Sequence, residues 1–149
     1  MYKLIVRRIV RRTFARLSTG EYEHVVKKFR PQSRFLFAGE HELGGERRGQ
    51  EAAREWFRHM LRRFPGIQIV PREIVVNGWP WNTIVATHLV ISAPRPGGRE
   101  YRNEGMQLLR LSWGRVVEDL IFEDTLALEA ELRRSAHSGE REPLTGSRR

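Results

Sequence analysis

The stretch that decides the fold is LLRLSWGRVVEDLIFEDT, residues 108–125. It joins two segments rich in β-branched and aromatic residues, 101–113 and 116–122, through a Trp113-Gly114 turn. Residues 124–134 then place leucines at helical spacing. The stretch therefore predicts two antiparallel strands followed by a helix.

Two further strand candidates precede this stretch, at residues 67–76 and 82–92. The turn signal Asn77-Gly78 separates them, and Pro96-Gly97-Gly98 separates the second from residues 101–113. Short loops of this kind join neighbouring antiparallel strands. The four segments together predict an antiparallel meander.

The first half of the chain has helical spacing instead. Apolar residues recur at helical intervals in residues 2–18, 21–29 and 50–64, and glycine or proline follows each segment. Residues 34–38 are a short strand candidate, and the glycine-rich, charged residues 39–49 predict a loop. Helices first and strands later predict an α+β domain, not an alternating βαβ fold.

Composition sets the outer limits. The 149 residues, 40% of them hydrophobic, suffice for one domain with a substantial core. No apolar run approaches the roughly 20 residues that span a bilayer, so we expect no membrane partner and a cytoplasmic location. The absence of cysteine excludes disulfides, thiolate nucleophiles and cysteine-ligated zinc. The polar residues 136–149 predict a disordered tail after a domain of residues 1–135.

The net charge of +9 raises the possibility of nucleic-acid binding. The arginines, however, are spread over predicted helices, strands and tail, and they form no single stripe with interleaved aromatic residues. We therefore do not expect a nucleic-acid partner. The alternative is a solvated, arginine-rich surface.

Three phrases, in this order, resemble one known domain: TFARLSTGEYEHVVKKF (13–29), GQEAAREWFRHMLRRFPG (49–66) and residues 108–125. The domain is shared by ketosteroid isomerases, SnoaL-like polyketide cyclases, limonene epoxide hydrolases and nuclear-transport-factor-2-like proteins, and the chain is most similar to the SnoaL-like branch. The resemblance covers about residues 1–135. It implies a cone-shaped α+β barrel, in which a curved antiparallel sheet wraps around N-terminal helices and encloses a pocket for a small hydrophobic molecule.

The resemblance also implies a homodimer formed through the outer face of the sheet. Apolar residues at both parities of the strands agree with this, because a sheet that is covered on both sides needs them.

The isomerase activity can be tested position by position. Ketosteroid isomerases use a helix tyrosine, an aspartate after the first strand and an acidic partner on the long strand; the matching positions carry Thr13, Phe37 and Gln107. A threonine hydroxyl is a poor acid, phenylalanine has no proton chemistry, and an amide is not a carboxylic acid. We do not expect steroid-type isomerisation.

A different pair, Asp124 and His88, carries the catalytic hypothesis. Asp124 matches an aspartate that SnoaL-like cyclases use as a general base, and His88 lies near a strand position where limonene epoxide hydrolases carry another aspartate. An imidazole and a carboxylate could share a proton or position a water. The hydrolases also carry an arginine where this chain has Ala86, so epoxide hydrolysis in its known form is not expected.

Each member of this pair has a structural alternative. His88 lies in an apolar segment, where a histidine can be an ordinary wall or core residue. Asp124 directly precedes a predicted helix and can be its N-cap. The sequence leaves both alternatives open.

Five further residues are candidate ligand contacts. Trp56, Trp81 and Tyr101 are either aromatic walls of the pocket or ordinary core residues. Asn103 and Gln107 share strand parity with Tyr101, so they would offer polar contacts to the same ligand.

The sequence predicts no metal and no cofactor. His41 and His59 lack partners at metal-ligand spacing, and GGERRG lacks the strand and the lysine of a phosphate-binding loop. Nucleic-acid association through the arginines stays a minor alternative, and two main functions remain open. One is an acid/base isomerase, cyclase or hydrolase of a small cyclic or carbonyl-bearing substrate; the other is a non-catalytic ligand-binding or dimeric interaction module of the same fold.

Overall fold

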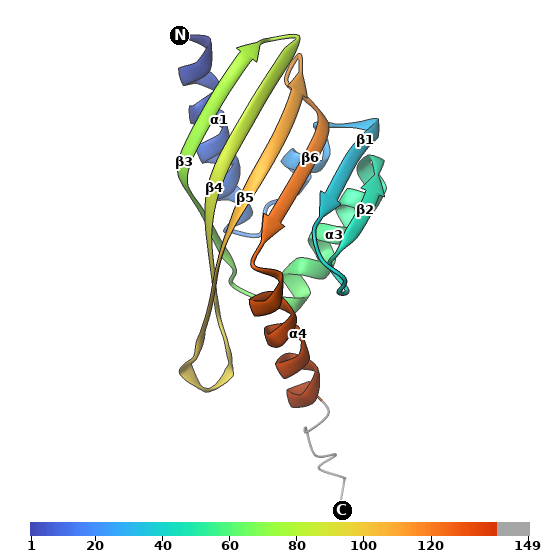
Figure 1. Cartoon of the computed structure of the whole chain (residues 1–149), viewed down its shortest axis with the longest axis vertical. Coiled ribbons are helices and arrows are strands. Elements are labelled where there is room, and N and C mark those ends of the chain that lie inside the picture. Colours follow the sequence, from blue (N-terminus) through green and yellow to red (C-terminus); the bar gives the residue numbers. More distant parts are fainter. Residues whose placement is uncertain (140–149) are drawn as a thin grey trace, which may run out of the picture.

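Six strands form a curved sheet in the order β2-β1-β6-β5-β4-β3, in a computed structural model that describes residues 1–139 (Figure 1). β1 and β6 pair parallel, and the other neighbours pair antiparallel. The predicted meander is confirmed, and β2 and β3 leave the sheet open at its two edges. The strands are β1 (Phe29–Phe37), β2 (Gly45–Arg48), β3 (Gln68–Trp79), β4 (Asn82–Pro94), β5 (Glu100–Ser112) and β6 (Arg115–Glu123).

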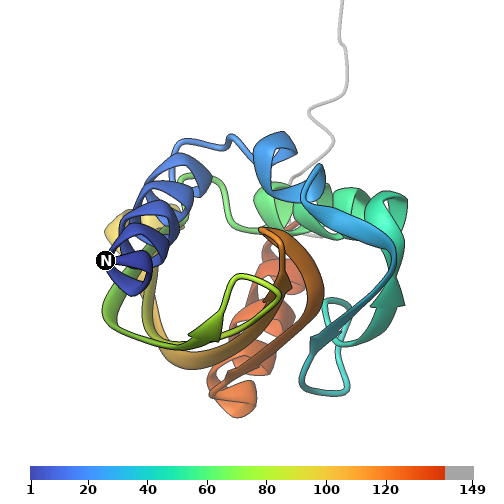
Figure 2. The ribbon, with the colours of Figure 1, turned by 90° about the horizontal axis from the view of Figure 1, so that it is seen from above.

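The helices are α1 (Tyr2–Leu17), α2 (Glu23–Val26), α3 (Gly49–Arg63) and α4 (Thr125–Gly139). α1 and α3 lie across the hollow of the sheet, so that sheet and helices together surround one interior (Figure 2). α1 buries Val6, Val10 and Phe14 at intervals of four residues, and α3 buries Trp56 and Met60 in the same way. The α+β class and the cone-shaped architecture are therefore confirmed.

The segment between α2 and α3 differs from the sequence prediction. β1 begins at Phe29, so the helix predicted over residues 21–29 shortens to α2. Phe29 is fully buried, and the hydroxyl of Ser33 donates to the carbonyl of Val116, which attaches the irregular first part of β1 to β6. β2 lies within the segment that the sequence predicted to be a loop. The sequence did not indicate a strand there, because its four residues, GERR, show no apolar alternation.

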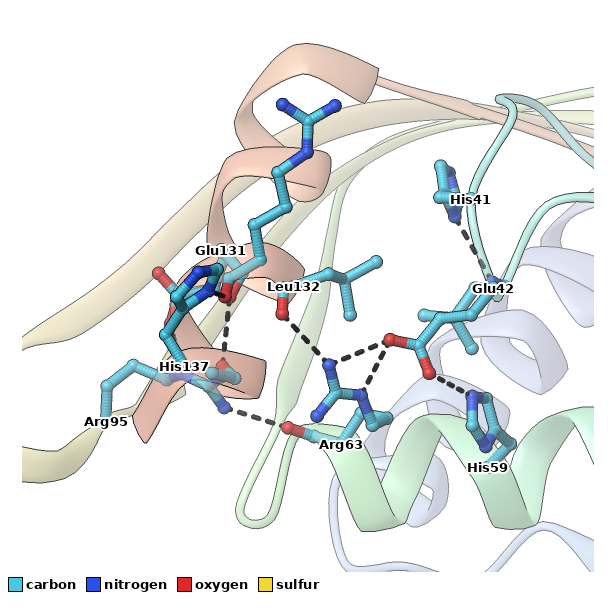
Figure 3. A network of polar contacts seen from close by, with 11 residues as sticks. His41, Glu42, His59, Arg63, Arg95, Glu131, Leu132 and His137 are labelled. Carbon is cyan, nitrogen blue, oxygen red and sulfur yellow. Dashed lines mark hydrogen bonds and ion pairs between the residues drawn. The ribbon is translucent and has the colours of Figure 1, made fainter. Parts of the chain in front are cut away.

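A polar network fixes α4 to the rest of the domain (Figure 3). Arg95 Nε lies 2.6 Å from Glu131 Oε1, and the two side chains are only 5% and 4% exposed. Arg95 also donates to the carbonyl of Arg63 at the end of α3, and Arg63 donates to the carbonyl of Leu132. α4 continues to Gly139, past the predicted end of the domain at residue 135, and residues 140–149 of the predicted tail lie outside the described residues.

The convex face of the sheet carries exposed apolar side chains. They are Val75, Met106, Leu108 and Phe122, which are 39–52% exposed. The strands therefore carry apolar residues on both faces: those on the inner face are buried, and those on the outer face are exposed. Within residues 1–139, no helix combines the length and the apolar character that crossing a membrane requires.

Candidate active site

A cavity of about 510 Å³ lies between α1, α3 and the concave face of the sheet. Its wall is mainly apolar, with Val10 and Phe14 from α1, Met60 from α3, and Leu89 and Leu109 from the sheet. The sheet contributes alternate positions, because successive side chains of a strand point to opposite faces. The volume falls in the range of small-molecule sites in proteins.

The cavity reaches the surface beside α1. Ile5, Ile9 and Trp113 line it and are 51%, 46% and 67% exposed. Trp113 lies in the β5–β6 turn, and its N–H donates to the carbonyl of Pro80 in the β3–β4 turn at 2.7 Å. This opening, the mouth, is thus framed by α1 and two hairpin turns. Trp81, a predicted pocket wall, lies in the β3–β4 turn outside the cavity lining and is 56% exposed.

The carboxyl group of Asp119 is a buried acid on the cavity wall. Asp119 is 4% exposed on the inner face of β6, and its Oδ1 accepts a hydrogen bond from Gln107 Nε2 at 2.9 Å. Burial raises the pKa of Asp119 to about 7, although the Gln107 bond acts in the opposite direction. A pKa near neutral pH suits a general acid or base, because the group can then accept and release a proton readily.

Glu123 is a second, half-buried acid on the same wall, four residues further along β6. Burial raises its pKa to about 7 as well, and Asn103 Nδ2 lies 3.3 Å from its Oε2. A Cβ added to Gly105, the cross-strand partner, would lie 2.8 Å from Glu123 Cγ, so the glycine leaves the space that Glu123 fills. Along the strand, Asp119 and Glu123 are about 13 Å apart, which makes them separate acids and not a proton-sharing pair.

The structure does not bring His88 and Asp124 together. His88 lies on the convex face of β4, and its Nε2 is 3.0 Å from Glu104 Oε2. Asp124 Oδ1 accepts the N–H of Ala127 at 3.2 Å, which is the N-cap arrangement for α4. Neither side chain lines the cavity, so the expected sharing of one pocket does not occur.

The other predicted contacts divide into two groups. Trp56 and Gln107 line the cavity. Tyr101 and Asn103 are buried on the same face of β5, as their parity predicted, but they lie outside the cavity lining. The Tyr101 ring packs 5.1 Å from that of Phe64, and Asn103 Nδ2 donates to the Tyr101 hydroxyl at 2.7 Å. Tyr101 is therefore a core residue, and Asn103 connects its hydroxyl to the carboxyl group of Glu123.

Asp119 and Glu123 are the site residues that the sequence pattern did not reveal, because a β-bulge in β6 changes which side chains point inward. The register shifts where Val116 and Glu118 face Leu111 and Arg110, so Val117 is an extra residue. Simple alternation from buried Val116 would turn Asp119 outward, whereas the bulge turns it inward. The signal that remained was the shared parity of Asp119 and Glu123.

Metal-ligating residues are not clustered in the part of the chain that the structure describes. Among residues 1–139, no three His, Asp or Glu side chains come together as a possible metal site. Proton transfer by Asp119 and Glu123 is the chemistry that the described side chains offer directly.

The profile of the SnoaL-like domain matches residues 10–119, more than half of the chain. The chain belongs to the SnoaL-like domain family. The matched region of this SnoaL-like protein holds the second half of α1, all of α3 and most of the cavity wall, and it ends at Asp119. No curated protein matches the sequence.

Solved structures of the same fold resemble this SnoaL-like protein. PrhC from Penicillium brasilianum has a TM-score of 0.75 at 16% identity, covering 95% of each chain. TerC, co-crystallised with polyporic acid, has a TM-score of 0.66 at 16% identity, covering 86% of this chain and 97% of its own. IdmH from Streptomyces antibioticus, a proposed polyketide cyclase, has a TM-score of 0.62 at 20% identity, covering 80% and 92%. At these identities the likeness shows the shared fold.

Proposed function

We propose that this protein binds a small hydrophobic, cyclic or carbonyl-bearing molecule in its cavity and transfers a proton to or from it with Asp119. The reaction class is that of an acid/base isomerase, cyclase or hydrolase. One observation carries the proposal: an acid whose pKa is raised to about 7 stands on the wall of an otherwise apolar cavity.

The chemistry of Asp119 supports a catalytic role over a purely structural one. A general base works best when its pKa lies near the working pH, because it is then both available and strong enough to accept a proton. Burying a carboxyl without a cationic partner costs stability, and proteins retain such groups mainly at functional sites. Gln107 would hold Oδ1 in place and leave the rest of the carboxyl for the substrate.

Glu123 extends the proposed chemistry. Its pKa is also raised to about 7, so it can return a proton at a second point of the substrate after Asp119 has removed one. The related structures agree with the substrate class: TerC was crystallised with polyporic acid, and IdmH is a proposed polyketide cyclase. Asp119 and Glu123 thus take the catalytic roles that the sequence suggested for His88 and Asp124.

The proposal is tested by exchange of protons next to a carbonyl. A panel of cyclic ketones is incubated with the protein in D₂O, and loss of the α-proton signal is followed by NMR. We expect exchange that increases with pH up to about 7 and then levels off, as Asp119 ionises. Asp119→Asn should lower the rate by about 10²- to 10⁴-fold.

Two further variants identify the group responsible. Glu118→Gln removes a neighbouring carboxyl that pairs with Arg34 outside the cavity, and it should exchange like the parent. Gln107→Leu removes the bond that lowers the Asp119 pKa, so the pH profile should move to higher pH. Exchange by Asp119→Asn at the parent rate contradicts the proposal. Ketone binding by thermal shift with no exchange favours the non-catalytic ligand-binding alternative.

A further inference from the structure

Exposed apolar side chains lie on α1 and at the two hairpin turns that frame the mouth of the cavity. We call them the mouth patch: Ile5, Ile9, Trp79, Trp81 and Trp113, each 46–67% exposed. The rings of Trp79 and Trp81 stack at 5.9 Å, and Trp113 lies 6.2 Å from Trp81. Three of the four tryptophans of the chain thus form one exposed cluster. Contiguous exposed apolar surface of this kind marks an interaction site.

Basic residues flank the patch on α1. Arg8 and Arg12 share a side of the helix with Ile5 and Ile9, because residues three, four or seven apart lie on one face. Both arginines are exposed, and neither makes an ion pair with any residue in 1–139. Residues 1–20 contain six Lys or Arg and no Asp or Glu. The exposed side of α1 is therefore apolar and cationic together.

The two hairpin turns continue this charge pattern. The hydroxyls of Tyr2 and Thr83 are hydrogen-bonded, which fixes the start of α1 beside the β3–β4 turn. Residues 74–99 and 105–117, which include both turns, contain no Asp or Glu. Basic or neutral side chains thus surround the mouth, and the complementary partner is anionic.

We infer that the mouth patch docks this protein on an anionic phospholipid surface. Tryptophan favours the level of the lipid headgroups, arginines attract anionic lipids, and a helix with mixed apolar and basic faces lies in that interface. Such docking is peripheral and needs no membrane-spanning segment, so it is compatible with the lack of a spanning helix in residues 1–139. It differs from the expectation, drawn from the sequence, of no membrane partner. Because the mouth opens within the patch, a docked protein takes up apolar ligands directly from the lipid.

The experiment is co-sedimentation with vesicles. The full chain is mixed with vesicles of phosphatidylcholine alone or of phosphatidylcholine and phosphatidylglycerol in equal parts. We expect binding to the mixed vesicles only, weakening as salt increases, because salt screens exposed charges. Brominated lipids should quench the tryptophan fluorescence, since three of the four tryptophans lie in the patch.

Matched variants separate the patch from the rest of the surface. Trp81→Ser/Trp113→Asn and Arg8→Gln/Arg12→Gln should each lower vesicle partitioning by about tenfold or more. Trp113 has φ 51° and precedes Gly114 with φ 74°, so Asn-Gly suits this turn and the variant should fold. Arg102→Gln/Arg133→Gln, with the same loss of charge at exposed sites elsewhere, should bind like the parent.

Four outcomes overturn the inference. In the first, the parent does not sediment with the mixed vesicles, and in the second, the mouth variants bind like the parent. In the third, the tryptophan variant loses self-association in light scattering. In the fourth, the parent prefers a DNA duplex to vesicles. The third outcome assigns the patch to a second copy of the chain, and the fourth assigns it to nucleic acid. Ketone exchange by Asp119 is independent of all four, so this inference can fail while the proposed function stands.

Discussion

The carboxyl group of Asp119 links the chemistry of the cavity to the stability of the fold. Its pKa is 3.8 in the reference state and about 7 in the folded protein, because burial disfavours the charged form. Between these values the folded state binds the proton more tightly than the unfolded chain. The contribution of Asp119 to stability is therefore best below about pH 4, falls as the pH increases towards 7, and stays low above it.

This gives a prediction for Asp119→Asn. The amide cannot ionise, so at pH 8 the variant should be more stable than the parent by an amount on the order of 1–4 kcal/mol. At pH 4 the two proteins should be nearly equal. Urea unfolding at both pH values measures the difference. Glu118→Gln is the control and should show no such gain, and a variant less stable than the parent at pH 8 would contradict the prediction.

Single residues also show how far the sequence could be interpreted. The inward orientation of Tyr101, Asn103 and Gln107 followed from the regular alternation of β5, which has no irregularity before Arg110. Asp119 lies after the bulge in β6, and a bulge depends on strand pairing that a single sequence does not display. The alternation of side chains along a strand predicted the inward-facing residues only where the pairing of the strands was regular.

At the scale of elements, α4 tests the role of Asp124. Asp124→Ala removes the N-cap bond to Ala127 and should lower the free energy of unfolding by about 1 kcal/mol. Asp124→Asn keeps a good capping residue, so its stability and its ketone exchange should both match the parent. Urea unfolding and the NMR exchange assay measure the two properties. If Asp124→Asn keeps its stability but loses exchange, Asp124 is catalytic and the capping explanation is wrong.

The elements that the sequence predicted well are those with a strong apolar period. α1, α3 and the four long strands each bury one stripe or face, so their hydrophobic pattern is enough to find them. β2 and the first half of β1 form through backbone pairing and a Ser33 hydrogen bond, which leave little trace in composition. Tertiary pairing decided the structure there.

Among residues 1–139, two groups of exposed apolar side chains lie outside the core: the mouth patch and the apolar side chains on the convex face of the sheet. We call the second group, Val75, Met106, Leu108 and Phe122, the convex patch; it lies over β3, β5 and β6. Met106 is near its centre, paired with His88 on one neighbouring strand and with Phe122 on the other. The resemblance to the family predicted a homodimer through this face. We propose that a second copy of the chain covers the convex patch, which leaves both mouths free.

Met106→Glu tests this assembly. A two-fold interface is self-complementary, so a residue near its centre meets the same patch of the partner, and each subunit would bring one new carboxylate into the apolar contact. Light scattering coupled to gel filtration should give twice the 17.5 kDa chain mass for the parent and the single-chain mass for the variant. Trp81→Ser/Trp113→Asn, at the mouth, should remain dimeric. A monomeric parent at micromolar concentrations, or a Met106→Glu variant that stays dimeric, rules out the convex face as the interface. Because Met106 points away from the cavity, a monomeric variant should still exchange ketone protons, and the two apolar surfaces would then have separate partners.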